Sequence, residues 1–285
     1  MIVADEQILA GSSATITGRF RDQDGDLVDP TGPVTVTVTR SDGTAVLTAA
    51  ATTAPSGTVG VRQAALSAAQ TATLDELTAT WDDGTQAVTT RIEVVAAYYA
   101  SVADIRASDP ALTDTGKYPS PAVVAARRLV ETEFEDICGV AFVPRYRLAP
   151  MRASGATRVV LDDPMLRTVR YADGLTAPQL AAVAASADGV AELPSGTWPS
   201  TPWHIGYEHG FDRPPADVLG AFLTRVRDVL NRSNRGVPDR TSSFTSGENG
   251  GTFALIVPGQ RGSKTGIPDV DVVLDRWSMR TPGIA

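Results

Sequence analysis

The densest group of potential metal ligands is a cluster of two histidines and two carboxylates within nine residues: His204, Glu208, His209 and Asp212. Imidazole and carboxylate groups bind zinc and iron. The surrounding residues, however, have the character of a strand over 203–207, in which His204 and Glu208 share one face and His209 points to the other. No HExxH pattern is present. The sequence therefore favours polar residues at a strand end over a metal centre.

Other segments with chemical potential each lack a required part. Residues 259–265 follow a strand-like run, but no glycine directly precedes Lys264 and no long helix follows, as a phosphate loop requires. Residues 22–26 have the acidic spacing of a calcium loop without its closing glutamate, which favours a hairpin turn. No GxSxG motif occurs, and Cys138 falls on the apolar stripe of a predicted helix. We therefore predict no catalytic residue, metal site or cofactor, and expect the protein not to be an enzyme.

The composition is that of a folded protein without internal disulfide bonds. Of 285 residues, 42% are hydrophobic and 20% are charged, which is enough apolar content for a sizeable core. A single cysteine excludes an internal disulfide and a thiolate zinc site. The net charge of −8 argues against a general nucleic-acid binder, because phosphate neutralisation needs a concentrated basic surface. With no apolar run of membrane-spanning length and an acidic N-terminus, we expect a soluble protein made in a cytoplasm.

The charge balance changes near residue 96, which predicts a domain boundary there. Residues 1–95 hold 12 acidic and 5 basic residues, a net −7, whereas residues 96–285 hold 21 and 20, a net −1. Residues 34–40 alternate apolar and polar side chains, as a half-buried strand does. Asp-Gly and Ser-Gly turns separate further strand-like runs, at 13–21, 44–50, 58–64, 74–81 and 86–94. We predict an immunoglobulin-like β-sandwich over 1–96, with Trp81 in its core.

The rest of the chain has the pattern of helices interrupted by strands. Prolines open a predicted helix that ends before Gly139, and Pro214 and Pro215 open another that runs to residue 231. A shorter helix is predicted around 102–107. Strands are expected between the long helices, at 146–148, 158–161, 168–171, 179–185, 189–193 and 203–207. We expect the apolar stripes of the long helices to form the subunit core. Their representatives are Val123, Phe134, Val218, Phe222 and Val226.

The C-terminal residues have the pattern of an extended arm with a short helix at 268–277. Five apolar residues share one face of that helix: Ile267, Val270, Val273, Leu274 and Trp277. Spacing alone favours docking on the helix's own domain over donation to a partner, because self-burial needs no second molecule. The predicted fold class is thus α+β and multidomain. It comprises a β-sandwich over 1–96, a helical domain over 97–258 with a β insertion at about 145–210, and an arm over 259–285.

The order of four segments resembles the head-to-tail adaptor proteins of tailed bacteriophages, also called connector or head completion proteins. These segments are FVPRY at 142–146, WHIGYEHGFDRPP at 203–215, VPDRTSS at 237–243 and GIPDVDVVLDR at 266–276. The chain is most similar to the adaptors of phages that infect actinobacteria. The resemblance covers roughly residues 100–280, and residues 1–95 depart from the minimal pattern of the family.

The resemblance implies a structural virion protein that forms a ring, usually twelve-fold, below the portal. Such a ring joins the DNA-filled capsid to the tail and forms part of the DNA channel. The implied partners are the portal protein, a tail-side connector or tail terminator protein, and neighbouring copies of the chain. Genome DNA would pass through without sequence-specific binding, and no membrane is involved. The implied location is the virion neck, after synthesis in the host bacterial cytoplasm.

The resemblance also implies a role for the C-terminal arm, whose five apolar residues would bind the portal. The two long helices would then provide the subunit core and the ring contacts. An alternative function is a surface-binding module, in which the β-sandwich recognises a carbohydrate or a host surface. Exposed aromatic residues on the sandwich would favour that alternative, but Phe20 and Trp81 are the only aromatic residues within 1–95.

Overall fold

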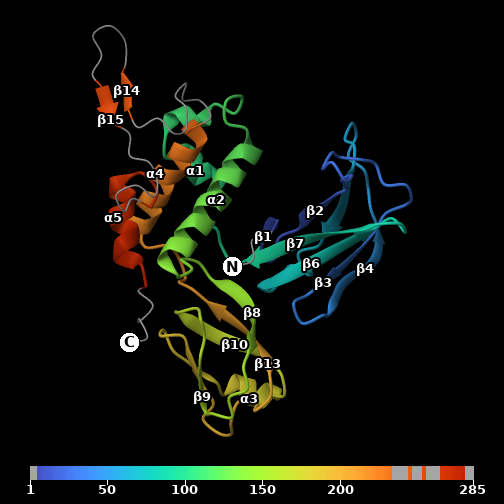
Figure 1. Ribbon diagram of the computed structural model, residues 1–285, viewed down its shortest axis with the longest axis vertical. Coiled ribbons are helices and arrows are strands. Elements are labelled where there is room, and N and C mark those ends of the chain that lie inside the picture. Colours follow the sequence, from blue (N-terminus) through green and yellow to red (C-terminus); the bar gives the residue numbers. More distant parts are fainter. Residues whose placement is uncertain (1–4, 233–242, 246–251, 255–263, 280–285) are drawn as a thin grey trace. The chain divides into compact units, whose positions relative to one another are not determined.

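The computed structural model describes residues 5–232, 243–245, 252–254 and 264–279 (Figure 1). The predicted α+β class is confirmed: these ranges contain five α-helices, and strands that pair both in parallel and antiparallel. The chain divides into two compact units. Unit 1 comprises Met1–Ala97 and Val143–Gly210, and unit 2 comprises Tyr98–Phe142 and Phe211–Ala285.

The N-terminal part of unit 1 consists of two sheets around one core. The larger sheet has the strand order β1-β7-β6-β3-β4. Its strands are β1 (Glu6–Leu9), β7 (Ala87–Val95), β6 (Asp75–Asp82), β3 (Thr35–Thr39) and β4 (Ala45–Ala51). β1 pairs with β7 in parallel, and the other pairs are antiparallel. The smaller sheet pairs β2 (Ala14–Arg19) with β5 (Val61–Leu66). Alternating side chains of both sheets fill the shared core.

Trp81 is fully buried in this core, as its pattern predicts, and it determines how closely β2 approaches. The indole Nε1 donates a hydrogen bond to Thr90 Oγ1 at 3.2 Å, which satisfies the polar atom of the ring. Gly18 lies against the ring face, where a Cβ atom would come within 2.5 Å of the indole. The close approach therefore requires glycine at position 18.

The second part of unit 1 contains two three-stranded antiparallel sheets. The first sheet has the order β10 (Leu166–Ala172), β13 (Trp203–His209) and β8 (Arg145–Met151). The second has the order β11 (Ala184–Ala185), β12 (Val190–Glu192) and β9 (Arg158–Val160). Trp198 and Trp203 stack in their common core, with ring centroids 5.0 Å apart.

The strand predicted at 179–185 is wrong for its first half. Residues Ala177–Ala181 form the helix α3, and only Ala184–Ala185 are a strand. Thr176 and Gln179 form a capping box at the start of α3, in which the backbone amide of Thr176 donates to Gln179 Oε1 at 2.9 Å. Pro178 in the first turn also suits a helix. These local signals outweigh the strand-like composition.

The β insertion groups with the N-terminal residues, whereas we predicted it within a helical domain over 97–258. Hydrogen bonds between the two parts of unit 1 account for this grouping. Ser41 Oγ bonds the Tyr146 hydroxyl at 3.2 Å, and Arg170 Nη1 donates to the Leu74 carbonyl at 2.6 Å. Arg145 also lies 3.4 Å from a Glu93 carboxylate oxygen.

Unit 2 is mainly helical. Its elements are α1 (Val102–Ala107), the 3-10 turn η1 (Pro110–Thr113), α2 (Ser120–Cys138), α4 (Ala216–Arg232), the hairpin strands β14 (Ser243–Thr245) and β15 (Thr252–Ala254), and α5 (Pro268–Trp277). α2 begins after Pro119 and ends at Gly139, whose left-handed φ of 67° closes the helix. α5 lies against α2 and α4 (Figure 1). None of the helices in the described ranges is both long and apolar enough to cross a membrane.

Candidate functional site

The candidate metal ligands on β13, His204, Glu208 and His209, do not share one face of the strand. Side chains alternate along β13, so His204 and Glu208 lie on the face opposite to the buried His209. His204 Nδ1 lies 3.1 Å from Asp173 Oδ2, and Glu208 Oε1 lies 3.1 Å from Arg170 Nη1. In the part of the chain that the structure describes, no group of three His, Cys, Asp or Glu residues could hold a metal ion.

The remaining candidates for chemistry, Asp212 and Cys138, belong to unit 2. Asp212 follows Gly210 and belongs to unit 2. Cys138 is fully buried at the end of α2, and burial raises the pKa of its thiol to about 11. A thiol that stays protonated is a poor nucleophile. Cys138 therefore acts as a small core residue.

A partly buried polar cluster joins Asp163, in the loop after β9, to β8 and β13, and it is not predicted from the sequence. Asp163 Oδ2 accepts hydrogen bonds from the Tyr207 hydroxyl at 2.5 Å and from Arg147 Nη1 at 2.8 Å. His209 Nε2 lies 4.0 Å from the same oxygen, and its buried Nδ1 has no hydrogen-bond partner among the described residues. Burial lowers the pKa of His209, opposed by Asp163 and reinforced by Arg147 and Arg145. Asp163 lies in a loop without a motif, so no local signal predicts this cluster.

Six aromatic side chains of unit 2 form a continuous cluster, which we call the aromatic junction. Its members are Tyr99, Phe134, Phe142, Phe211, Phe222 and Trp277. The centroid of the Phe142 ring lies 5.8 Å from that of Phe211 and 5.9 Å from that of Trp277, which in turn lies 5.6 Å from Phe211. Tyr99 links Phe142 to Phe222, and its hydroxyl donates to Glu135. Each such pair contributes about 0.5–1.5 kcal/mol beyond its buried area.

The aromatic junction brings together the segments that carry the family resemblance. Phe142 begins the FVPRY segment, Phe211 lies within WHIGYEHGFDRPP, and Trp277 directly follows GIPDVDVVLDR. The backbone amide of Phe211 also donates to the carbonyl of Ala141 at 3.1 Å. Three segments that are far apart in the sequence thus meet in unit 2. The VPDRTSS segment lies outside the described residues, except for its last residue.

The α5 face that was predicted as a portal-binding surface packs on the chain itself. Val270 and Leu274 are 1% and 0% exposed, and Ile267, Val273 and Trp277 are half-buried. The two buried side chains cannot anchor a partner while α5 stays docked. In the structure, Val270 and Leu274 therefore dock on their own domain. Portal binding by residues 259–285 stays a prediction, and residues 259–263 and 280–285 lie outside the described ranges.

Polar contacts fix both ends of α5. At its start, Asp271 Oδ1 accepts hydrogen bonds from the backbone amide and the hydroxyl of Thr265, both at 2.8 Å. At its end, Asp217 Oδ2 accepts from Trp277 Nε1 and from Arg276 Nη1, both at 3.1 Å. The hydrogen bond from Trp277 holds the pKa of Asp217 below its usual value. Because Asp217 lies in the first turn of α4, these contacts tie the end of α5 to the start of α4.

The predicted core residues of α2 and α4 are all fully buried: Val123, Phe134, Val218, Phe222 and Val226. A two-point ion pair also links the helices, because Arg225 Nε and Nη2 each lie 2.8 Å from a Glu133 carboxylate oxygen. Arg225 Nη1 bonds Asp228 at 2.7 Å. The arginine is therefore fully engaged by carboxylates in a nearly buried position, which fixes how α2 lies against α4.

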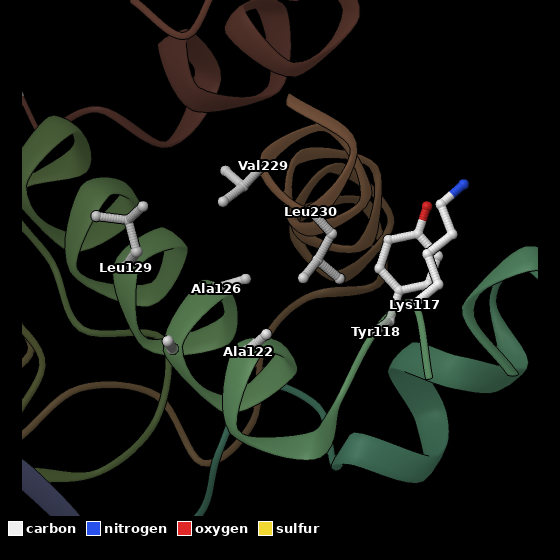
Figure 2. Close-up of a pocket in the computed structure, with 8 residues that line it drawn as sticks. Lys117, Tyr118, Ala122, Ala126, Leu129, Val229 and Leu230 are labelled. Carbon is white, nitrogen blue, oxygen red and sulfur yellow. The ribbon is translucent and has the colours of Figure 1, made fainter. Parts of the chain in front are cut away.

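A groove between the start of α2 and the end of α4 forms a concave, mainly apolar surface of unit 2 (Figure 2). Its volume is about 340 Å³, and its lining residues are Lys117, Tyr118, Ala122, Ala125, Ala126, Leu129, Val229 and Leu230. Short alanine side chains on α2 leave the space open. Leu129, 57% exposed, stands at one end, and Lys117 and Tyr118 stand at the other. The Tyr118 hydroxyl donates to Asn231 Oδ1 at 2.6 Å, which holds that end to α4.

The two aromatic residues of the N-terminal sheets, Phe20 and Trp81, are both 0% exposed. An aromatic platform for a carbohydrate would need such side chains at the surface. Within residues 5–95 the structure thus offers no aromatic support for the surface-binding alternative.

No protein-family model matches the chain, and no curated protein matches it. Among solved structures, a similar chain belongs to one described as the neck of an empty GTA particle computed with C6 symmetry. The TM-score is 0.38 at 14% sequence identity, and the alignment covers 57% of this chain and 81% of that chain.

Proposed function

We propose that this protein is a structural component of a phage-like virion, a head-to-tail adaptor that joins the portal of a DNA-filled head to the tail. The aromatic junction is the observation that carries the proposal. Three of the segments through which the chain resembles such adaptors contribute Phe142, Phe211 and the adjoining Trp277 to it. Motif residues that build one shared core support a common fold more strongly than the same motifs scattered over the surface.

We propose a structural rather than an enzymatic role. In the part of the chain that the structure describes, the side chains best suited to catalysis make structural contacts. His204 pairs with Asp173, Glu208 pairs with Arg170, and Cys138 fills space in the helical core. The net charge of the chain, −8, adds support. A ring of such acidic subunits would not bind the phosphates of DNA that slides through it.

We further propose that the copies form a ring around a DNA channel, twelve-fold as in the family that the chain resembles. Residues 1–96 would form an immunoglobulin-like domain at the outside of the ring. The order β7-β6-β3-β4 beside the β2-β5 pair supports this assignment, because variable-type immunoglobulin domains extend their GFC sheet in the same way.

Complementation of particle assembly tests the proposed function. Particles made without this chain should accumulate as DNA-filled heads and free tails, and supplying the chain should restore tailed particles. Cryo-electron microscopy of those particles should place the chain at the neck. Tails that join heads without the chain, or purified particles that lack it, would refute the adaptor role.

A matched variant separates this role from an enzymatic one. His204→Ala removes the exposed imidazole of the best candidate cluster, so it should restore tailed particles as well as the unaltered chain does. Loss of assembly by this variant, together with stoichiometric zinc or iron in the unaltered protein, would favour the hypothesis that the protein is a metal-dependent enzyme.

A further inference from the structure

The groove between α2 and α4 has an exposed cation, Lys117, at one end. Lys117 lies over the ring of Tyr118, with its Nζ 5.3 Å from the ring centroid. Among the described residues no carboxylate pairs with Lys117, although the chain carries 33 acidic residues. A fitting occupant would therefore bring an apolar side chain to the alanine floor and a carboxylate to Lys117.

The outward face of α5 has this combination. Val272 is 61% exposed, although its neighbours Val270 and Leu274 are buried. Asp269 and Asp275 flank it at one helical turn on either side, and both are exposed. Asp275 pairs with Lys264 at 2.8 Å, whereas Asp269 forms no ion pair within the described ranges. The face thus presents an apolar side chain beside a free carboxylate.

The two surfaces lie at opposite ends of the α2–α4 pair. α5 contacts the end of α2, where Cys138 O accepts from the amide of Met279 at 2.9 Å, and the start of α4 at Asp217. The groove is lined by the start of α2 and by the last turns of α4 (Figure 2). Val229 lies about 18 Å beyond Asp217 along α4, at about 1.5 Å per residue. One chain therefore cannot seat its own α5 face in its own groove.

Complementary surfaces at opposite ends of the α2–α4 pair can make a heterologous, head-to-tail contact between copies. Such contacts close into rings or continue as filaments. We propose that the groove of one copy receives Val272 of a second copy of this chain, and that Lys117 pairs with Asp269 across the contact. This inference rests on the proposed function, for which it identifies the surfaces that join neighbouring subunits.

Disulfide trapping between two single-cysteine variants tests the contact. Leu129→Cys and Val272→Cys are prepared separately, mixed at high protein concentration and oxidised. The control pairs Leu129→Cys with Val160→Cys, because Val160 is 71% exposed but lies in unit 1, outside the proposed contact. We expect the Leu129→Cys and Val272→Cys pair to give at least about fivefold more mixed dimer than this control. Cys138 stays unreactive because it is buried. Equal yields from the two pairs would overturn the proposal.

Charge reversal gives a second test with its own control. Lys117→Glu and Asp269→Lys should each lower the yield of trapped dimer about tenfold, and a chain that carries both changes should recover it, because every contact then contains one lysine and one glutamate. Failure of the double variant to recover the yield would also overturn the pairing.

The two proposals can fail separately. Trapping uses only the purified chain, whereas the adaptor role is tested in particles. If the chain joins heads to tails but the cysteine pair does not form a dimer, the contact is refuted and the adaptor role stands. If trapping succeeds but the chain is absent from particles, the adaptor role is refuted and the contact stands.

Discussion

His209 is buried beside Asp163, Arg147 and Arg145, and burial lowers its pKa. The folded chain therefore binds a proton at this site less readily than the unfolded chain, whose histidine has a pKa of about 6.5. Stability should be fully present above that pH and should fall as the pH drops through about 6.5 towards the lower folded value. In His209→Gln, this part of the pH dependence should disappear.

Thermal unfolding at several pH values between about 5 and 8 measures this effect as the difference between unaltered and variant protein. His204→Gln is the control variant, because it replaces the other histidine of the chain, whose side chain is 56% exposed, and keeps His209 in place. A pH profile that is the same for the unaltered chain and His209→Gln would contradict the interpretation of the cluster.

Gly18 is the residue at which a single methyl group should have the largest effect on the N-terminal sheets. Its Cβ would come within 2.5 Å of the fully buried Trp81 ring, so the ring or strand β2 has to shift. We expect Gly18→Ala to lower the free energy of unfolding by about 1–3 kcal/mol, as overpacked cores do. Gly220→Ala is the opposite case, because position 220 of α4 is open, and it should raise stability by about 0.5–1 kcal/mol. Circular dichroism during heating measures both; an unchanged melting temperature for Gly18→Ala would refute the close contact.

At the scale of elements, α5 connects the ends of two other helices. Leu274 is fully buried against them, so Leu274→Ala should lower the free energy of unfolding of unit 2 by about 2–5 kcal/mol. Val272→Ala lies on the same helix but on its exposed face, and it should change stability by less than about 0.5 kcal/mol. Chemical denaturation followed by tryptophan fluorescence can compare them, because Trp277 belongs to the aromatic junction. Equal stabilities would mean that α5 does not dock on its own chain in solution.

At the scale of the whole molecule, one exposed valine and one ion pair are a small contact for association. Binding costs on the order of 4–15 kcal/mol of lost translational and rotational freedom, so a contact of this size should be weak without a template. We expect a 29.9 kDa monomer at low micromolar concentration, larger species at high concentration, and less association as salt rises. Portal protein should promote ring formation. Sedimentation velocity with and without portal tests this, and a stable ring at sub-micromolar concentration without portal would contradict templating.

The sequence by itself determined the local elements. Pro121 and Gly139 indicate the bounds of α2, and the apolar stripe of α4 selects its buried residues, because caps and helical periodicity act within a few residues. The period-2 pattern at 34–40 likewise corresponds to β3. Local reasoning failed where two local signals competed, as at α3, whose capping box at Thr176 outweighs its composition.

Which elements meet depends on contacts between segments that are far apart in the chain. Phe142, Phe211 and Trp277 form one cluster, and Asp163 reaches Tyr207 and Arg147, although no local pattern shows that these residues meet. The tertiary structure also decided that the apolar face of α5 is buried on its own chain, between alternatives that spacing alone left open. The physical reason is that periodicity shows which side chains avoid water, whereas the surface that covers them depends on packing between segments far apart in the chain.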